Sequence, residues 1–377
     1  MSRTIVSLLC ALLTATTGCY VAHERGAPPP PCGLAAPTCV TREAPCDPLR
    51  LVSAECVGET WQCPIGAEMY ARPWRDDRCL PLEGRAGGLI DGVHEAPVPV
   101  PIGDRCAWVV PGDDGLSLAF VDVAPSCAEL GDAAPLEVEA TDGYDYLALA
   151  SSLALSDGPA VLVRGWQLDA SAPFGVRGLG VGLSSVRGDT LGSPLPWLFD
   201  GDVDLGDAAV VWGDHVYAYG CPGTPRFLLE DCHVGRAPRG RERDPSGWEI
   251  FGEGGWGVGE PAVVFGSGPH RGPVVVDPRG GLVHVYAVGF GNTIEITRAS
   301  RPEGPWSPPT ALVGCELPDD DEDAYCAGPV VHLELFDPTR PGEIVVSYAI
   351  GTTASDGAER RARDPHAYWP RVVRVAW

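Results

Sequence analysis

The sequence contains no lysine. All 27 of its basic residues are arginine, and they stand against 51 acidic residues, which gives a formal net charge of −24. Proteins that bind nucleic acid need clustered positive charge, so this balance excludes a nucleic acid as the partner. We attribute the missing lysine to the composition of a GC-rich genome rather than to chemistry. With 45% apolar residues a packed core is feasible, which excludes a disordered chain.

Beyond its first residues, the sequence also lacks any run of about 18 apolar residues without charge, so no later segment is expected to span a bilayer. Residues 1–19 combine one arginine, an apolar stretch and small residues, as in a secretory signal peptide. Their last four residues, TTGC, resemble a bacterial lipobox, in which Cys19 becomes lipidated; an ordinary signal peptide is the alternative. No aspartate follows Cys19, so we expect an outer-membrane lipoprotein, held only by its lipid and a proline-rich tether over 20–31.

Cysteine spacing typical of zinc sites is absent too, because no CxxC occurs and histidine is sparse near the cysteines. Of the 14 cysteines, Cys10 lies in the signal and Cys19 at the anchor. The remaining 12 form an even number, which favours disulfides in an oxidising compartment over the alternative of a zinc site.

Six of these cysteines crowd into residues 32–79 and predict a small crosslinked module over 32–87. Six cysteines allow 15 connectivities, and the sequence does not choose among them. Two further pairs each close an interval of 11 residues, and another pair flanks a predicted strand pair. We expect disulfides at Cys221, Cys232, Cys315, Cys326, Cys106 and Cys127.

Residues 88–377 show no long stretch with the 3.6-residue period of a helix. Instead, a strand, an Asp/Gly/Pro turn and a second strand occur five times, and the second strands begin at 116, 160, 216, 282 and 344. Such even repeats predict a β-propeller rather than the alternative, a large β-sandwich. About 290 residues at roughly 58 per unit give five blades. We therefore expect an all-β, five-bladed β-propeller after the disulfide-rich module, with the terminal strand RVVRVAW closing the ring.

Two segments carry a resemblance to known propellers. RASRPEGPWSPPTALV (298–313) looks like the outer-strand motif of glycosidase-type five-bladed propellers, and DAAVVWGDHVYAYGC (207–221) is similar to their first blade strands. Together with VVHLEL and IVVSYA, they resemble a family of bacterial envelope propellers of largely unknown function, some of which are endo-D-arabinanases. The resemblance covers roughly 145–377 and implies a carbohydrate partner.

Glycoside hydrolysis needs two carboxylates facing one bond, about 5–5.5 Å apart for retention and about 6.5–9.5 Å for inversion. Asp145, Asp207 and Glu260 stand about one blade apart, near expected starts of innermost strands. The resemblance implies the roles of base, orienting carboxylate and acid, and Asp207 has the closest strand context. Turn or capping roles are the alternative for Asp145 and Asp207. Glu260 departs from the pattern, because the fourth hairpin begins at Gly272.

Other motifs are less specific. His332 and Glu334 alternate with apolar neighbours, so we expect them on one face of a strand, either lining the channel, binding an ion or forming a structural pair. The acidic run 319–323 offers ligands to calcium but is more typical of a solvated loop, and no EF-hand spacing is present. No other cofactor is expected, and neither a GxSxG elbow nor a serine–histidine–acid triad is assigned.

Two function classes remain. The first is a lipid-anchored envelope protein that acts on a polysaccharide, with glycoside hydrolysis as its chemistry. The second is a non-catalytic propeller that binds glycan or protein at the cell surface. A catalytic site should combine carboxylates with aromatic side chains in one mouth of the propeller. The candidate aromatic residues are Trp166, Trp197, Trp212 and Trp256, with packing roles as the alternative for each.

Overall fold

The computed structural model describes residues 31–33, 36–37, 39–42, 46–65, 67–69, 98–102, 105–112, 115–124, 127–139, 144–171, 176–199, 204–221, 231–265, 272–368 and 370–377. The expected signal peptide, Cys19 and nearly all of the tether lie outside the described residues, as does Cys79. The chain forms two compact units. One lies within Met1–Thr41 and Leu51–Trp74, and the other within Arg42–Arg50 and Arg75–Trp377.

The first unit is built from very short strands. β1 (Cys39–Thr41) lies between β2 (Arg50–Val52) and β5 (Glu68–Met69), while β3 (Glu55–Val57) and β4 (Thr60–Gln62) form a separate hairpin. Every residue of β3 is exposed, so this hairpin has little apolar core to stabilise it. Two disulfides, Cys32–Cys56 and Cys39–Cys63, supply crosslinks instead.

The expected crosslinks at Cys106 and Cys127 need a correction. Cys106 is bonded to Cys46, 60 residues away, so Cys46 does not pair inside the predicted module and the segment 42–50 belongs to the propeller unit. The side chain of Cys127 lies outside the described residues. Sequence spacing did not show this bridge, because it joins segments that only the fold brings together. The bridges Cys221–Cys232 and Cys315–Cys326 are both present, as expected.

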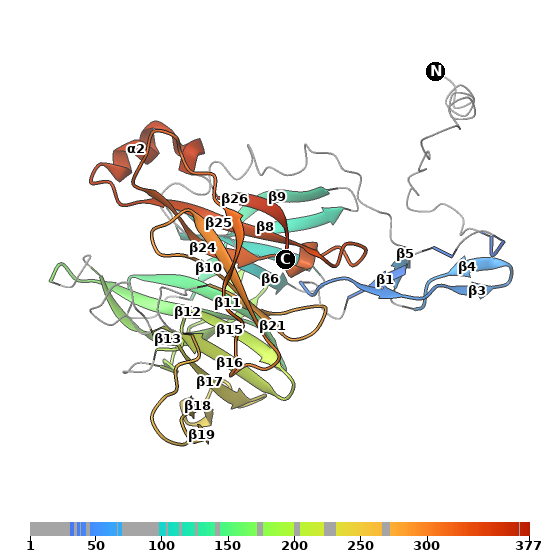
Figure 1. Ribbon diagram of the computed structural model, residues 1–377, viewed down its shortest axis with the longest axis horizontal. Helices are drawn as coiled ribbons and strands as arrows, with labels where there is room; N and C mark the ends of the chain where they lie inside the picture. Colours follow the sequence, from blue (N-terminus) through green and yellow to red (C-terminus); the bar gives the residue numbers. More distant parts are fainter. Residues whose placement is uncertain are drawn as a thin grey trace. The chain divides into compact units, whose positions relative to one another are not determined.

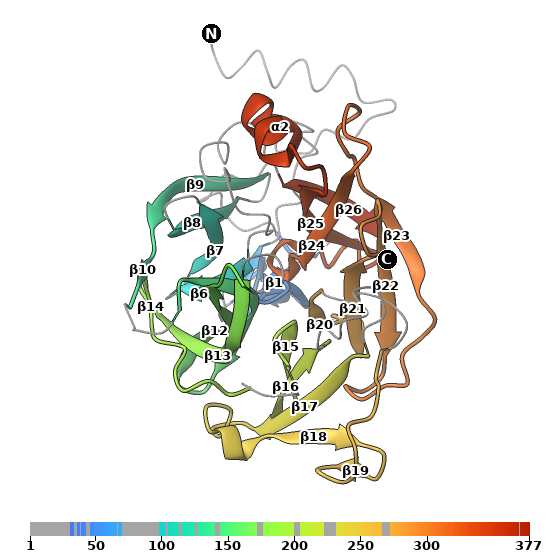
Figure 2. The same ribbon diagram turned by 90° about the vertical axis from the view of Figure 1, so that its left-hand side faces the viewer.

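The second unit is a five-bladed β-propeller. Five sheets follow one another along the chain and surround a common centre in chain order (Figures 1 and 2). The first strands of neighbouring sheets, β6, β11, β15 and β20, lie next to one another at this centre. The first sheet consists of β6 (Val98–Ile102), β7 (Arg105–Gly112), β8 (Gly115–Ala124) and β9 (Cys127–Pro135).

The remaining four sheets have the same antiparallel meander, with one exception in the second sheet. The second contains β10 (Glu137–Val138), β11 (Tyr146–Leu155), β12 (Gly158–Leu168), β13 (Val176–Arg187) and β14 (Thr190–Leu191). In it, β10 lies at the outer edge and pairs in parallel with β14. The third contains β15 (Ala208–Trp212), β16 (His215–Gly220), β17 (His233–Pro238), β18 (Glu249–Gly252) and β19 (Gly255–Trp256). The fourth contains β20 (Val274–Val276), β21 (Leu282–Ala287), β22 (Thr293–Ala299) and β23 (Thr310–Gly314). The fifth contains β24 (Ala324–Val331), β25 (Glu343–Thr352) and β26 (Arg371–Ala376), with the short helix α2 (Gly357–Arg363) before β26.

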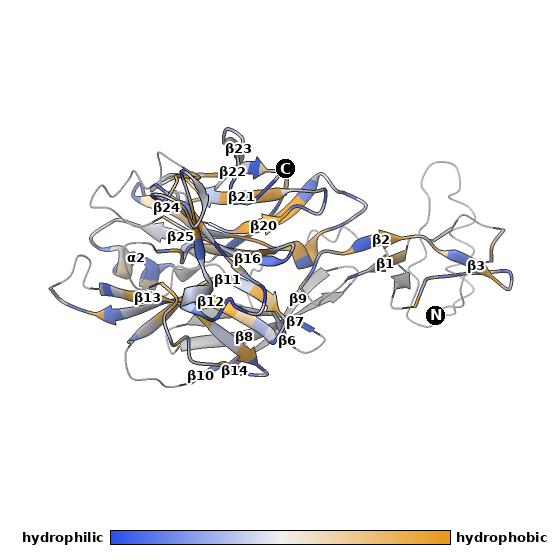
Figure 3. Ribbon diagram, turned by 90° about the horizontal axis from the view of Figure 1, so that it is seen from below, coloured by the Kyte–Doolittle hydropathy of each residue, from blue (hydrophilic) through white to orange (hydrophobic). Residues whose placement is uncertain are grey.

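The apolar runs of the sequence arise because the sheets are covered on both faces. In β12, Val161 and Val163 pack against the first blade, while Ala160 and Leu162 pack toward the third. Similar apolar clusters fill the junctions between the third and fourth and between the fourth and fifth blades. Strands buried on both sides read as continuous apolar runs rather than as alternating patterns. Figure 3 shows this as orange strands in the blades, for example β20.

The ring closes differently from the expectation. The terminal strand β26 pairs with β25 in the fifth sheet and does not join the first sheet. Instead, Trp108 on β7 donates a hydrogen bond through its indole nitrogen to Glu334 Oε1 at 2.9 Å, and its ring lies 4.3 Å from that of His332. Both partners belong to the fifth blade, so this buried polar contact joins the last blade to the first.

Among the described residues, no helix is both long and apolar enough to cross a membrane.

Candidate functional site

The starts of the innermost strands lie at one mouth of the propeller. Asp145 directly precedes β11 and Asp207 directly precedes β15, so the two residues hold equivalent positions in the second and third blades. Arg164, near the end of β12, reaches from the second blade to Asp207 in the third. This contact shows that both strand starts lie at the same end of their blades.

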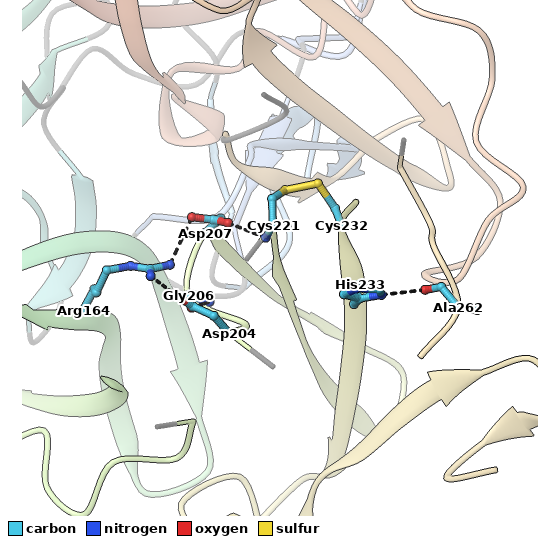
Figure 4. Close-up of a disulfide and its surroundings, with 8 residues drawn as sticks. All are labelled: Arg164, Asp204, Gly206, Asp207, Cys221, Cys232, His233 and Ala262. Atoms are coloured by element: carbon cyan, nitrogen blue, oxygen red, sulfur yellow. Dashed lines mark hydrogen bonds and ion pairs between the residues drawn. A yellow bond between two sulfur atoms is a disulfide. The ribbon is translucent and has the colours of Figure 1, made fainter. Parts of the chain in front are cut away.

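Asp207 is a nearly buried carboxylate whose two oxygens both accept hydrogen bonds. Arg164 Nη2 donates to its Oδ1 at 3.3 Å, and the backbone nitrogen of Cys221 donates to its Oδ2 at 2.7 Å (Figure 4). The side chain is only 8% exposed. A carboxylate held on both oxygens is fixed in orientation, which suits it to positioning neighbouring groups.

Asp204 is a second carboxylate at the same guanidinium, and the sequence did not single it out. Its Oδ2 accepts from Arg164 Nη1, and its Oδ1 accepts from the backbone nitrogen of Gly206 at 3.1 Å. One guanidinium therefore separates Asp204 from Asp207, which keeps them closer than the roughly 9.5 Å upper limit for glycosidase carboxylate pairs. The Asp204 side chain is 26% exposed, so it is the member of the pair that faces solvent more.

Arg164 is the residue that sequence analysis missed most clearly. It is the one charged residue in the apolar run AVLVRGW, and a charge inside a strand buried on both faces needs partners. Its side chain is only 12% exposed, and its guanidinium carbon lies 5.7 Å from the centre of the Trp166 ring. A lone arginine in such a run is the signal that could have predicted the carboxylate pair.

Two features hold the segment 204–207 in place. Gly220 on β16 lies so close to the backbone of Asp204 that a β-carbon there would come within 1.6 Å of the Asp204 carbonyl oxygen. The Cys221–Cys232 disulfide ties the end of β16 to the start of β17, next to the nitrogen that binds Asp207 (Figure 4). The contact thus depends on a glycine for close approach and on a crosslink for rigidity.

Asp145 is placed at the same mouth but in a different environment. It is exposed, and its Oδ2 accepts a hydrogen bond from the backbone nitrogen of Leu168 at 2.6 Å. Its own backbone nitrogen donates to the Trp166 carbonyl at 2.8 Å. The side chain therefore caps the end of the β11–β12 pair, which is the turn role that the sequence left open.

Glu260 is not brought to this mouth. It is exposed and follows β19, the outermost strand of the third blade, whereas the innermost strand of the fourth blade begins only at Val274. Its carbonyl oxygen accepts from the backbone nitrogen of Glu253 at 3.1 Å, within the outer part of the blade. The structure thus groups Asp145 and Asp207 at strand starts and separates Glu260 from them.

His332 and Glu334 form a buried structural pair. The expected strand ends at Val331, and a short 3-10 helix, Leu333–Leu335, follows. His332 Nδ1 donates to Glu334 Oε1 at 2.7 Å, and Ser347 Oγ lies 2.7 Å from His332 Nε2. A serine in contact with a histidine, which in turn contacts an acid, is the arrangement of a hydrolase triad. All three side chains are at most 1% exposed, however, so substrate cannot reach them.

The acidic run 319–323 is only partly a solvated loop. Asp321 is buried and accepts hydrogen bonds from Tyr368 Oη at 2.6 Å and from Arg360 at 3.0 Å. Burial alone would raise the pKa of Asp321, but these bonds, those from Thr352 and the Asp323 nitrogen, and the charge of Arg360 together hold it below the usual value. In the described part of the chain, no group of three His, Cys, Asp or Glu residues has the arrangement of a metal site.

The four candidate tryptophans are all partly buried. The Trp197 ring lies against Gly165 and Gly180, where added β-carbons would come within 3 Å of it. Trp212 packs at the edge of the core between the third and fourth blades, and Arg236 stacks on the Trp256 ring at 4.3 Å. These contacts are the packing roles that sequence analysis held open as alternatives.

Comparisons with known proteins bear on the fold. No protein-family model and no curated sequence matches the chain. A solved structure described as a "putative hydrolase" from Bacteroides ovatus ATCC 8483 aligns with a TM-score of 0.52 at 15% identity, covering 77% of this chain and 87% of that one. A likeness at such low identity concerns the fold alone, and it agrees with the propeller.

Two other solved structures are more distant. A thermostable family-43 glycoside hydrolase aligns at 13% identity with a TM-score of 0.45, covering 77% of this chain and 90% of that one. An endo-1,5-alpha-L-arabinanase from Thermotoga petrophila RKU-1 aligns at 12% identity with a TM-score of 0.43, covering 75% and 70%.

Proposed function

We propose that this protein is an exported propeller that acts on a polysaccharide by glycoside hydrolysis at the mouth formed by the strand starts. The observation that carries the proposal is the carboxylate pair Asp204 and Asp207, held by Arg164 across the junction of two blades. Paired carboxylates at this spacing are what glycoside hydrolysis requires. The propeller fold and the resemblance of 207–221 to glycosidase-type blades support the same class.

The two carboxylates have different roles in this proposal. Asp207, with both oxygens bonded, is the positioning residue that fixes Arg164. Asp204 is more exposed and is the carboxylate that can contact a sugar. Asp145, exposed at the neighbouring strand start, is the candidate base named from sequence. Glu260 does not take part, because it lies in the outer part of the third blade.

The test is hydrolysis of arabinan and of other envelope glycans, measured as release of reducing ends. We expect Asp204→Asn to lower kcat by about 10²- to 10⁴-fold, the range for loss of a general acid or base. Asp207→Asn should also lower kcat, because it releases Arg164 from one partner. Both variants should remain folded, but each leaves the nearly buried Arg164 with one charged partner fewer and should therefore lower the free energy of unfolding.

A matched control is Asp157→Asn. Asp157 also pairs with an arginine, Arg243, at 2.9 Å, but it lies in the turn between β11 and β12, at the other end of the second blade. The control should keep full activity. If Asp204→Asn and Asp207→Asn are as active as this control, the proposed site is wrong.

The second candidate function is a non-catalytic propeller that binds glycan or protein. The placement of Glu260 favours it, because the predicted acid is missing from the mouth and Asp145 is engaged in capping a strand pair. Binding of a glycan by the wild type without any release of reducing ends would establish this function instead.

The expected location of the protein outside the cytoplasm is part of the proposal. Disulfides in both units indicate an oxidising compartment outside the cytoplasm. Lipidation at Cys19 and an outer-membrane location rest on the sequence of residues 1–20. Calcium binding at the acidic run 319–323 is a separate proposal, which a titration of the protein with calcium tests.

A further inference from the structure

One aromatic residue differs from the rest in its exposure. Among the described side chains, Phe290 is the one phenylalanine, tyrosine or tryptophan that is exposed, with 48% of its surface accessible. Val288, two residues earlier, is 39% exposed. Exposed single hydrophobic residues are common on proteins, so the position of Phe290 and its support decide whether this exposure has a use.

Phe290 lies in the turn between β21 and β22, which belongs to the mouth described above. This turn follows the second strand of the fourth blade, as the Cys221–Cys232 connection does in the third blade. The turn also contacts the start of β24, because the backbone nitrogen of Cys326 donates to the Gly291 carbonyl at 3.0 Å. Repetition of the blades therefore places Phe290 on the same face as Asp207.

The turn is held rigidly. The backbone nitrogen of Cys315 donates to the Asn292 carbonyl at 2.7 Å, and Cys315 is bonded to Cys326, so one disulfide anchors both contacts of the turn. The Phe290 ring packs nearly perpendicular to the half-buried Tyr325 ring, with centroids 4.9 Å apart. The ring is thus held by a neighbouring side chain, while 48% of the residue's surface is accessible to solvent.

A rigidly held, exposed aromatic ring on the same face as a carboxylate pair fits one kind of ligand well. The C–H groups of a sugar ring form an apolar face with slight positive charge, which is complementary to the negative face of an aromatic ring. A fixed ring loses little conformational entropy when it binds, so more of the contact energy appears as affinity. Two exposed apolar side chains are far from the roughly 1,000 Å² that a specific protein interface buries.

We propose that Phe290 is a stacking platform for a sugar ring of the polysaccharide, at a subsite remote from Asp204 and Asp207. The proposal rests on the proposed function, since it concerns the same face and the same class of ligand. In this proposal Phe290 binds a sugar unit of the polymer and takes no part in cleavage of the glycosidic bond. Long oligosaccharides, which can reach from the carboxylates to the fourth blade, should therefore depend on Phe290 more than short ones.

The test uses the full protein with arabinan and with short and long arabino-oligosaccharides as probes, and with other envelope glycans if arabinan does not bind. We expect Phe290→Ala to weaken binding of the long probes about ten-fold, as expected for losing contact with half of a buried phenylalanine side chain. KM should rise while kcat stays constant, which marks loss of uniform binding. Phe290→Tyr should restore affinity, because it keeps the aromatic face.

The matched control is Val258→Ala, which removes a side chain that is 57% exposed on the outer part of the third blade. It should leave affinity and KM unchanged. Unchanged affinity of Phe290→Ala, beside loss of turnover in Asp204→Asn, would overturn the platform and leave the proposed function standing. Self-association that Phe290→Ala abolishes, with no change in glycan affinity, would also overturn it. A wild type that binds no glycan would overturn both.

Discussion

The indole nitrogen of Trp108 donates a hydrogen bond to Glu334 Oε1 at 2.9 Å, although the two residues are 226 positions apart. Both side chains are at most 1% exposed. The four other blade junctions contain apolar clusters, whereas this junction is closed by a polar contact in the described part of the chain. Glu334 Oε1 also accepts from His332, so Trp108 supplies one of its two hydrogen bonds. Loss of this buried hydrogen bond makes the closure of the propeller ring sensitive to single substitutions here.

Trp108→Phe is therefore expected to destabilise the propeller. Phenylalanine keeps most of the apolar contacts but removes one of the two donors to Glu334 Oε1, which should cost about 0.5–1.5 kcal/mol in the free energy of unfolding. The measurement is chemical denaturation of purified protein. Trp377→Phe is the control, because it removes the bond from the indole nitrogen to the Pro341 carbonyl at an exposed position. An equal loss in both variants would contradict a special role for the Trp108 contact.

Removal of the Cys221–Cys232 disulfide by a double alanine substitution should lower the free energy of unfolding by about 3 kcal/mol in the chain-entropy model. Removal of Cys315–Cys326 should cost a similar amount, because both bridges close 11-residue intervals. Only the first should lower kcat on a glycan, since this bridge fixes the position of the Cys221 backbone nitrogen that donates to Asp207. A lower kcat in the second variant alone would argue against the placement of the site.

Asp321 should make stability depend on pH. Its pKa is below the usual value, so its contribution is present above the ordinary aspartate pKa of about 3.9 and is lost as the pH falls through the lower, folded value. The difference in unfolding free energy between the wild type and Asp321→Asn should hold above about pH 5 and shrink below about pH 4. Asp319→Asn, at an exposed position of the same run, is the control. A difference that does not vary with pH would refute this account.

Cys19→Ser should release the protein from the membrane fraction if Cys19 carries a lipid anchor. Fractionation of cells, followed by mass spectrometry of the N-terminal peptide, measures both location and acylation. The Cys10→Ser variant, which changes a cysteine within the signal, should remain with the membrane. A wild-type protein that is soluble and carries no acyl group would show that residues 1–19 are an ordinary signal peptide.

Features that depend on local pattern could be predicted from the sequence. The apolar runs and turn residues indicated an all-β propeller, because strands buried between neighbouring blades must be apolar on both faces. The two short cysteine intervals predicted Cys221–Cys232 and Cys315–Cys326, because each pair closes a short loop within the propeller. The position of Asp207 before a strand also followed from its immediate context.

Glu260 shows where local pattern fails. Its spacing of 53 residues from Asp207 suggested one blade, but the third blade has a fifth strand, β19, beyond the four of the first and fourth blades, so that distance ends in the outer part of the same blade. The number of strands in a blade cannot be read from the spacing between two acidic residues. Short strands joined by glycine-rich turns leave no apolar run that would reveal them.

By itself, the sequence determined the strand-rich repeat, the short-range crosslinks and the acidic residues at strand starts, because each of these depends on neighbours along the chain. Only the tertiary structure decided that Cys46 bonds to Cys106, that Arg164 holds Asp204 and Asp207, and that Trp108 meets Glu334. These partners come from different segments, and packing brings them together only when the blades close into a ring. Contacts between distant segments leave no periodic trace in a single sequence, which is the physical reason for the division.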